Sequence, residues 1–351
     1  MQRLNGRIVR AEDPVNLEMP FATLSEFITP TESFYVRTHF PIPKIDRARW
    51  QLRIEGEVNH PIDISYDELI AMPAKTIPAT LECAGNNRLF LEPKVKGVQW
   101  ELGAVGTAEW TGVPLSAILE KAEPKQGALE VIFEGLDEGK VSEAKAPDGP
   151  IRYARSLPLA KAFDDVLLAL KMNQKELLPE HGFPARAIVP GWYAMASVKW
   201  LNRIIVTDRP FNGYYQTLDY AYWKRTGDLD QLTALGPMAL KAEISQPSNG
   251  SKLPAGTRTT VHGAAWGGNI QKVELSVDGG KTWREAELID GKQSGAWRRW
   301  RLEWATPTKP GAVTLMARAF DEKGQTQPTQ RDESLGTYVI HHLLPISVQI
   351  E

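Results

Sequence analysis

The chain has 351 residues, 42% of them hydrophobic and 24% charged, and its formal net charge is −2. These values are ordinary for a globular protein long enough for two domains, and they exclude a strongly basic nucleic-acid binder or a membrane-surface binder. No run approaches the roughly 18 consecutive apolar residues that would cross a bilayer. The opening stretch MQRLNGRIVRAEDPVNLEMP lacks the apolar segment of a signal peptide. We therefore expect a cytoplasmic protein, or a periplasmic one if a leader was removed.

The first two thirds of the chain predict short helices among strands. Residues 50–58 (WQLRIEGEV) alternate apolar and polar side chains, which is typical of a half-buried strand. Ser65 and Glu68 have the spacing of a capping box, so a short helix is expected after Ser65. A second short helix is expected after Thr111, and the β-branched residues of 199–208 favour another strand.

From about residue 237 the pattern changes to closely spaced strands. Proline, glycine and serine are frequent in 244–257, which suits the loop that opens a domain. Residues 273–277 alternate and lead into Asp278-Gly279-Gly280, as in a hairpin. The same period-2 pattern recurs in 297–304, 313–321 and 346–350. We predict an α+β chain, with a mixed domain over 1–236 and an all-β immunoglobulin-like sandwich over 237–351.

Cys83 is the only cysteine, which excludes an internal disulfide and fits a reducing compartment. A free cysteine is often simply a small buried side chain. In TLECAGNNR (80–88), however, a tight bend follows the thiol, and then come Asn86, Asn87 and Arg88. A nearby arginine favours the thiolate, the form that binds metals or attacks electrophiles. The residues alone leave two roles open: a metal ligand, or a nucleophile paired with one of the six histidines.

The segment TLECAGNNR resembles the molybdenum-ligand segment of the sulfite oxidase family. Further segments resemble that family in the same order, over nearly the whole chain. They are FYVRTHFPIP (34–43), residues 96–115, FEGLD (133–137), HGFPARAIVPG (181–191), SVKWL (197–201) and SVDGGKTW (276–283). The resemblance implies a sulfite-oxidase-type domain in which Cys83 binds molybdenum beside the dithiolene of one molybdopterin. Soft thiolate ligation suits such a metal. The C-terminal sandwich would be a dimerisation domain, so a homodimer is expected.

The resemblance also implies the remaining site residues. Molybdopterin would be bound by Tyr35, Val36, Arg37, Thr38, His39, Asp137, His181, Arg186, Ser197, Val198 and Lys199. The substrate would be contacted by Arg37, Arg88, Trp100 and Tyr220, in keeping with the suitability of guanidinium groups for oxyanions. Taken singly, these residues have ordinary interpretations, such as a turn for Asp137 or core packing for Trp100. Their joint occurrence inside matching segments is what supports the site.

Two features depart from the family pattern. Sulfite oxidases usually continue the cysteine segment with Asn-Arg-Arg, whereas Asn87 stands in the middle place here. A further substrate arginine normally comes from the C-terminal domain, but residues 265–274 contain none, and Lys272 is a poor substitute. The substrate pocket is therefore expected to be less cationic than is usual in the family.

We expect oxygen-atom transfer that oxidises sulfite to sulfate, with Arg37 and Arg88 positioning the anion and Tyr220 hydrogen-bonding it or assisting proton movement. The electrons would go to an external acceptor, because the His-Pro-Gly-Gly motif of a haem domain is absent and no haem is expected in this chain. A reductase of nitrate, a sulfoxide or a similar oxo-compound is the main alternative. A non-catalytic dimeric binding protein and a cysteine hydrolase are the others.

Overall fold

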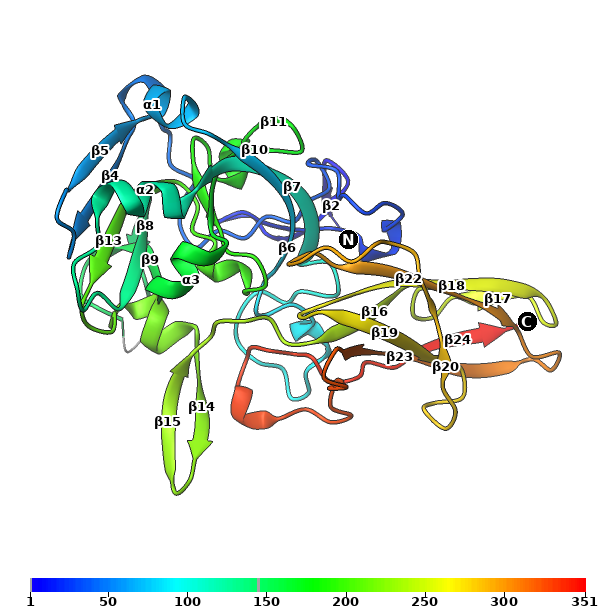
Figure 1. Ribbon diagram of the computed structural model, residues 1–351. Helices are drawn as coiled ribbons and strands as arrows, with labels where there is room; N and C mark the ends of the chain where they lie inside the picture. The colour runs from blue at the N-terminus through cyan, green and yellow to red at the C-terminus, as the bar shows by residue number, and fades with distance from the viewer. Residues whose placement is uncertain (1, 144–145) are drawn as a thin grey trace.

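The computed structural model describes residues 2–143 and 146–351 (Figure 1). Strands predominate, and the helices are short: α1 (Tyr66–Ile70), α2 (Leu115–Ala122) and α3 (Leu159–Asp164). Single 3₁₀ turns lie at Phe21–Thr23, Arg47–Arg49, Arg88–Phe90, Pro179–His181, Ala194–Ala196 and Glu333–Leu335, and a π-helical turn at Tyr215–Asp219. Among the described residues, no helix is long and apolar enough to cross a membrane.

Two sheets enclose the core of the N-terminal region. The first has the strand order β11-β10-β7-β6, with β12 also paired to β10. Its strands are β6 (Lys75–Glu82), β7 (Val105–Pro114), β10 (Leu167–Met172), β11 (Lys175–Glu176) and β12 (Arg186–Ile188). The second has the order β5-β4-β13-β8-β9. Its strands are β4 (Gln51–Gly56), β5 (Ile62–Ser65), β8 (Glu130–Lys140), β9 (Pro150–Pro158) and β13 (Leu201–Thr207). Buried Leu52, Phe133 and Leu168 belong to one continuous apolar core, which joins the two sheets.

The local predictions for this region are largely confirmed. Strand β4 lies within the predicted segment 50–58, and β13 lies within 199–208. The Ser65 hydroxyl accepts the Glu68 N–H while the Glu68 carboxylate accepts the Ser65 N–H, so the capping box that starts α1 is present. Helix α2 begins later than predicted because β7 continues to Pro114, paired with β10.

The C-terminal region is a sandwich of two sheets. One has the order β16-β18-β22-β21 and the other β17-β24-β23-β19-β20. Their strands are β16 (Lys241–Gln246), β17 (Lys252–Leu253), β18 (Arg258–Trp266), β19 (Ile270–Ser276), β20 (Arg284–Glu285), β21 (Glu287–Leu288), β22 (Arg298–Ala305), β23 (Gly311–Asp321) and β24 (Ile346–Ile350). The inward side chains of both sheets, such as Val261 and Val273, share one apolar core. The predicted hairpin is confirmed, because β20 pairs antiparallel with β19.

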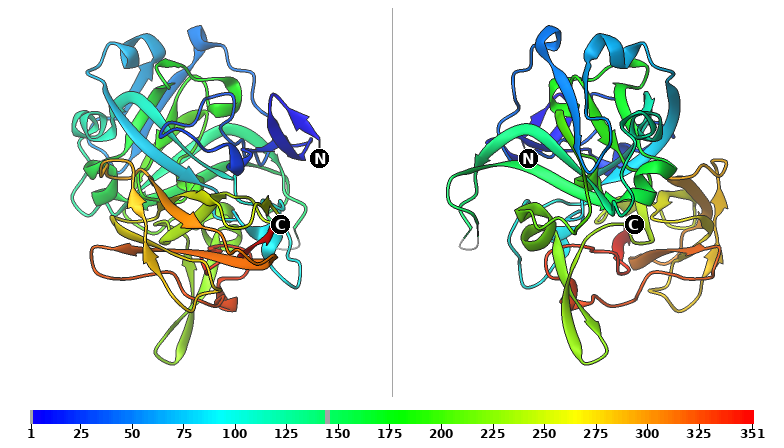
Figure 2. Two further views of the ribbon diagram at one scale, coloured as in Figure 1. Left: turned by 90° about the vertical axis from the view of Figure 1, so that its right-hand side faces the viewer. Right: turned by 60° about the vertical axis from the view of Figure 1, so that its left-hand side comes forward.

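Three smaller parts complete the molecule. A ribbon of β1 (Arg3–Leu4), β2 (Arg7–Ala11) and β3 (Asn16–Glu18) packs at the N-terminal end. A hairpin of β14 (Ala221–Thr226) and β15 (Leu229–Ala234) projects away from the body between the two regions (Figures 1 and 2). Residues 336–339, which we call the strap, lie in the connection between β23 and β24 and return to the N-terminal region.

Candidate active site

Cys83 lies at the end of β6 and faces two hollows at once. It lines an inner cavity and an outer cleft that opens to solvent. The Cys83 N–H donates to the Ala104 carbonyl at 2.9 Å, and the Cys83 carbonyl accepts the Asn86 N–H at 2.8 Å. These bonds fix the backbone on both sides of the thiol. The cysteine is 6% exposed and packs beside Tyr35, yet its position between two hollows is not that of a purely structural core residue.

The loop after Cys83 is held by its own polar side chains. Asn86 Oδ1 accepts the Ala104 N–H at 3.0 Å, and Asn86 Nδ2 donates to Glu82 Oε1 at 3.2 Å. A Cβ at Gly85 would lie 2.2 Å from the Arg88 guanidinium, so the glycine leaves room for that group in its observed position. The bend predicted at Ala84-Gly85 therefore lets the Arg88 guanidinium pack directly against the backbone of Gly85.

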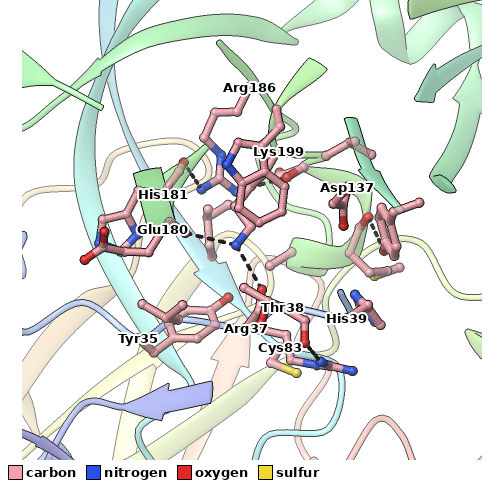
Figure 3. Close-up of a pocket in the computed structure, with 18 of the residues that line it drawn as sticks. Tyr35, Arg37, Thr38, His39, Cys83, Asp137, Glu180, His181, Arg186 and Lys199 are labelled. Atoms are coloured by element: carbon pink, nitrogen blue, oxygen red, sulfur yellow. Dashed lines mark hydrogen bonds between the residues drawn. The ribbon is translucent and has the colours of Figure 1, made fainter. Parts of the chain in front are cut away.

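The inner cavity contains every residue that the sequence predicted for the cofactor (Figure 3). Tyr35, Val36, Arg37, Thr38 and His39 cross it as one extended segment. The others come from β8 and from the stretch around β12 and β13, and are Asp137, His181, Arg186, Ser197, Val198 and Lys199. Segments far apart in sequence thus converge on one cavity.

Arg37, Arg186 and Lys199 line the inner cavity, and backbone carbonyls orient the last two. Arg186 donates through Nη1 to His181 O and through Nη2 to Ser197 O, both at 3.0 Å. Lys199 Nζ donates to Arg37 O and to Glu180 O, both also at 3.0 Å. Burial lowers the pKa of Arg186 to about 10 and lowers the pKa of Lys199 well below its usual value. Buried cations that have further N–H groups available for hydrogen bonds favour a bound anion.

Asp137 contributes a buried acceptor to the same cavity. Its Oδ1 has no hydrogen-bond partner, and burial raises its pKa to about 6 although Lys199 opposes that shift. A buried polar atom without a partner is costly unless a ligand supplies one. The cavity therefore fits a molecule that has both a phosphate for the cations and N–H donors for Asp137, as molybdopterin has.

His39 and Tyr220 connect the two hollows. His39 Nε2 lies 2.7 Å from the Tyr220 hydroxyl, and both residues line the inner cavity and the outer cleft. The His39 ring is stacked on Tyr153 with ring centroids 4.6 Å apart. Burial, followed by the charges of Arg37 and Lys199, lowers the pKa of His39 well below 6.5, so the imidazole is neutral. Burial, followed by the charges of Lys199 and Arg186, lowers the pKa of His181 to about 3.

The outer cleft gathers the predicted substrate residues Arg37, Arg88 and Tyr220. Arg88 donates from Nε to Thr337 O at 3.1 Å and from Nη1 to Val98 O at 2.9 Å. Nη2 makes neither of these bonds. Thr337 belongs to the strap, so the C-terminal region orients an arginine of the N-terminal region.

Two cleft residues were missed by the sequence analysis. Tyr338 of the strap lies over Arg88, with 5.2 Å between the guanidinium carbon and the ring centroid, and packs on Tyr220 at 5.0 Å between centroids. Its hydroxyl donates to Asp219 Oδ1 at 2.9 Å. Asp219 directly precedes Tyr220, so that motif could have indicated it, whereas nothing local to GTYV marks Tyr338.

Trp100, Asn87 and Lys272 lie elsewhere. Trp100 is fully buried behind Tyr35 and lines neither hollow. Asn87 Nδ2 donates to Glu243 Oε1 at 2.5 Å, away from the cleft and toward β16. Lys272 Nζ is bound to Glu274 Oε1 at 2.7 Å on the C-terminal sandwich and does not line the cleft. The expectation of a less cationic pocket is thus consistent with this geometry.

Protein side chains alone do not form a metal site here. No group of three or more His, Cys, Asp or Glu side chains that could hold a metal ion occurs within residues 2–143 and 146–351. A metal at Cys83 would therefore need a cofactor to provide further ligands. The inner cavity beside the thiol has the charges and acceptors to hold one.

Comparisons with known proteins match this geometry. Residues 39–215 match the family described as oxidoreductase molybdopterin binding domain, and residues 233–342 match the Mo-co oxidoreductase dimerisation domain. The chain is 35% identical to sulfite oxidase of Gallus gallus, covering 92% of this chain and 73% of that one. It is 33% identical to mitochondrial sulfite oxidase of Mus musculus, covering 91% of this chain and 61% of that protein's length. Nitrate reductase [NADH] of Volvox carteri is 34% identical, and the match covers 93% of this chain and 40% of that protein's length.

A solved structure agrees with the fold. The sulfane dehydrogenase SoxCD from Paracoccus pantotrophus superimposes with a TM-score of 0.80 at 27% identity, covering 95% of this chain and 84% of that one.

Proposed function

Because the chain belongs to the sulfite oxidase family of molybdopterin-binding oxidoreductases, we propose that it is an enzyme that oxidises sulfite to sulfate. One observation carries the proposal: Cys83 lies between a cation-rich cavity and an open cleft that contains two arginines. Such an arrangement provides a thiolate ligand, a cradle for an anionic cofactor and an approach for an oxyanion substrate.

The residues present fit molybdopterin. Arg186 and Lys199 would bind its phosphate, and the free Oδ1 of Asp137 would accept from pterin N–H groups. His39 and His181, both neutral, can each donate one N–H or accept one at the cofactor. Cys83 Sγ would be the protein ligand of molybdenum, which when bound supplies the two-electron change and the transferred oxygen atom.

The remaining residues handle the substrate and its protons. Arg37 and Arg88 bind the anion and stabilise the charge that grows on its oxygens as sulfate forms. The overall reaction, sulfite plus water to sulfate plus two protons and two electrons, releases protons in a largely enclosed site. With Nε2 of His39 unprotonated, the Tyr220 hydroxyl can donate to it and take up a proton from the cleft.

The direction of the reaction is tested by two steady-state assays on protein produced with molybdenum. We expect sulfite-dependent reduction of ferricyanide and little nitrate-dependent oxidation of reduced viologen. The reverse result would favour the reductase alternative, which the likeness to nitrate reductase keeps open. A protein that contains no molybdenum by elemental analysis, and turns over neither substrate, would instead favour a binding protein.

We also propose the assembly and setting of the enzyme. The C-terminal sandwich, which we assign to the immunoglobulin type, would pair two copies, consistent with its match to a dimerisation domain. Electrons would leave to a separate acceptor rather than to a haem in this chain. We also propose a domain boundary near residue 236 and, because a single cysteine suits a reducing compartment, a cytoplasmic location.

A further inference from the structure

The walls of the outer cleft are more apolar than an inorganic anion requires. Val98, Val141, Tyr214, Leu218 and Tyr338 form the apolar part of a lining that also contains charged side chains. The Leu218 side chain is 45% exposed although it is a large aliphatic group. Concave surfaces with apolar walls and few polar groups are typical of sites for organic ligands. Sulfite has no carbon atoms to place against such walls.

The charge near Cys83 is also lower than a doubly charged anion would favour. Arg37 and Arg88 are the arginines that line the cleft, and the Asp219 carboxylate lies at the same end. Lys96, which also lines the cleft, is paired with Glu143 at 2.5 Å, so its charge is compensated. Lys140 also lines the cleft. Within the group of Arg37, Arg88 and Asp219, which interact electrostatically with one another, two cations and one carboxylate give a formal charge that suits a single negative charge.

We propose that the cleft accepts organic sulfinates, R–SO₂⁻, and that the enzyme oxidises them to sulfonates, R–SO₃⁻. This inference rests on the proposed function and names a further substrate class for the same site. The SO₂⁻ group would lie against Arg37 and Arg88, and the organic group against Leu218 and Tyr214. A sulfinate has one negative charge, a lone pair on sulfur as sulfite has, and an apolar group for the walls.

The reaction balances with the components of the proposed function. A sulfinate plus water gives a sulfonate, two protons and two electrons. One new S–O bond forms and the C–S bond stays intact. The sulfur is oxidised by two electrons, which leave to the same one-electron acceptor that serves sulfite, such as ferricyanide in the assay. The protons can leave through Tyr220 and His39, as for sulfite.

The experiment compares sulfite, methanesulfinate and benzenesulfinate on the molybdenum-loaded protein with ferricyanide. We expect both sulfinates to be oxidised, with the KM for benzenesulfinate about tenfold below that for methanesulfinate, because the ring buries more apolar surface. Calorimetric titration with benzenesulfonate and methanesulfonate should show the same preference without turnover. Oxidation of sulfite without either sulfinate, or equal affinity for both sulfonates, would overturn the inference.

Variants test where the organic group lies. Leu218→Ser should lower the preference for benzenesulfinate over methanesulfinate at least about threefold. Leu229→Ser, at the exposed tip of the β14–β15 hairpin and outside the cleft, is the matched control and should leave the preference unchanged. An unchanged preference in Leu218→Ser would contradict the proposal that the organic group of the sulfinate lies against Leu218. If the loaded protein oxidises none of the three compounds, the proposed function and the inference both fail, whereas oxidation of sulfite alone overturns only the inference.

Discussion

The inner cavity and the outer cleft meet at Cys83 but are built in different ways. The inner cavity is made by the N-terminal region alone, and its cations are held by carbonyls of that region. The outer cleft needs the C-terminal region, because Thr337 O orients Arg88 and the Tyr338 ring packs against it. A cofactor site can thus be complete within one region, while the substrate site depends on how the two regions pack.

Further contacts from the C-terminal region fix Glu82 and Ala84, the two neighbours of Cys83 in the sequence. Lys241 Nζ of β16 is paired with Glu82 Oε1 at 2.6 Å, with both side chains fully buried, and Trp266 Nε1 donates to Glu82 Oε2 at 2.9 Å. The Val339 N–H of the strap donates to Ala84 O at 2.9 Å. The C-terminal region therefore fixes the residues on both sides of Cys83. None of its described residues lines the inner cavity.

The strongest test removes the group that both hollows share. Cys83→Ser should lower sulfite oxidation by at least about 1000-fold, because loss of residues that merely support a metal ligand already costs about 10–100-fold. Pterin content should fall less, since the inner cavity is intact. Turnover and pterin content measure the two effects. Full activity in this variant would refute the ligand assignment.

Next comes a change confined to the inner cavity. Arg186→Met leaves the carbonyls of His181 and Ser197 without their buried donor and removes a phosphate cation. We expect at least about a tenfold loss of molybdopterin content, with an unchanged KM for sulfite in the loaded fraction. Arg203→Met, which breaks a surface ion pair with Glu55, is the control. A raised KM for sulfite with normal cofactor content would show that Arg186 acts on the substrate, and would contradict the assignment of the inner cavity to the cofactor alone.

The complementary change lies in the outer cleft. Arg88→Met removes a charge-assisted hydrogen bond to the anion, worth about 1.5–3 kcal/mol, so the KM for sulfite should rise about 10–100-fold. Cofactor content should stay normal because Arg88 does not line the inner cavity. Steady-state kinetics and molybdenum analysis together check this. Loss of cofactor in parallel with activity would contradict the assignment.

A smaller effect is expected from the strap. Tyr338→Ala removes an aromatic pair worth about 0.5–1.5 kcal/mol, so the KM for sulfite should rise about 2–10-fold while kcat changes little. Tyr338→Phe keeps the ring on Arg88 and Tyr220 and loses only the bond to Asp219, so most of the affinity should return. If Phe and Ala are equally damaging, the ring is not what positions Arg88.

The smallest effect concerns the pH dependence of stability in the inner cavity. The pKa of Asp137 is raised to about 6, so between about pH 4 and 6 the folded, cofactor-free protein binds a proton more tightly than the unfolded chain. Stability should therefore fall as the pH rises through that window. Asp137→Asn should remove this part of the slope, seen as a Tm difference of a few degrees. An identical slope in both proteins would show that Asp137 is not buried as described.

The sequence could predict the cofactor residues because they lie in contiguous segments with a recognisable order. Tyr35 to His39 and Ser197 to Lys199 each form one short stretch, so finding the segment finds all its members. The capping box of α1 and the strands β4 and β13 were predictable for a similar reason: their signals lie within a few residues. Trp100 was predicted at the substrate but lies behind Tyr35, because a segment's position does not fix the direction of each side chain.

The sequence by itself determined the thiol, the charged set around it and the type of cofactor that they suit. Only the tertiary structure decided which side chains face the substrate. Arg88 and Tyr338, or Asn87 and Glu243, are separated by more than 150 residues, and their contacts arise where the two regions pack together. Local periodicity and motifs report short-range preferences, whereas such contacts depend on the summed burial and hydrogen bonding of both regions.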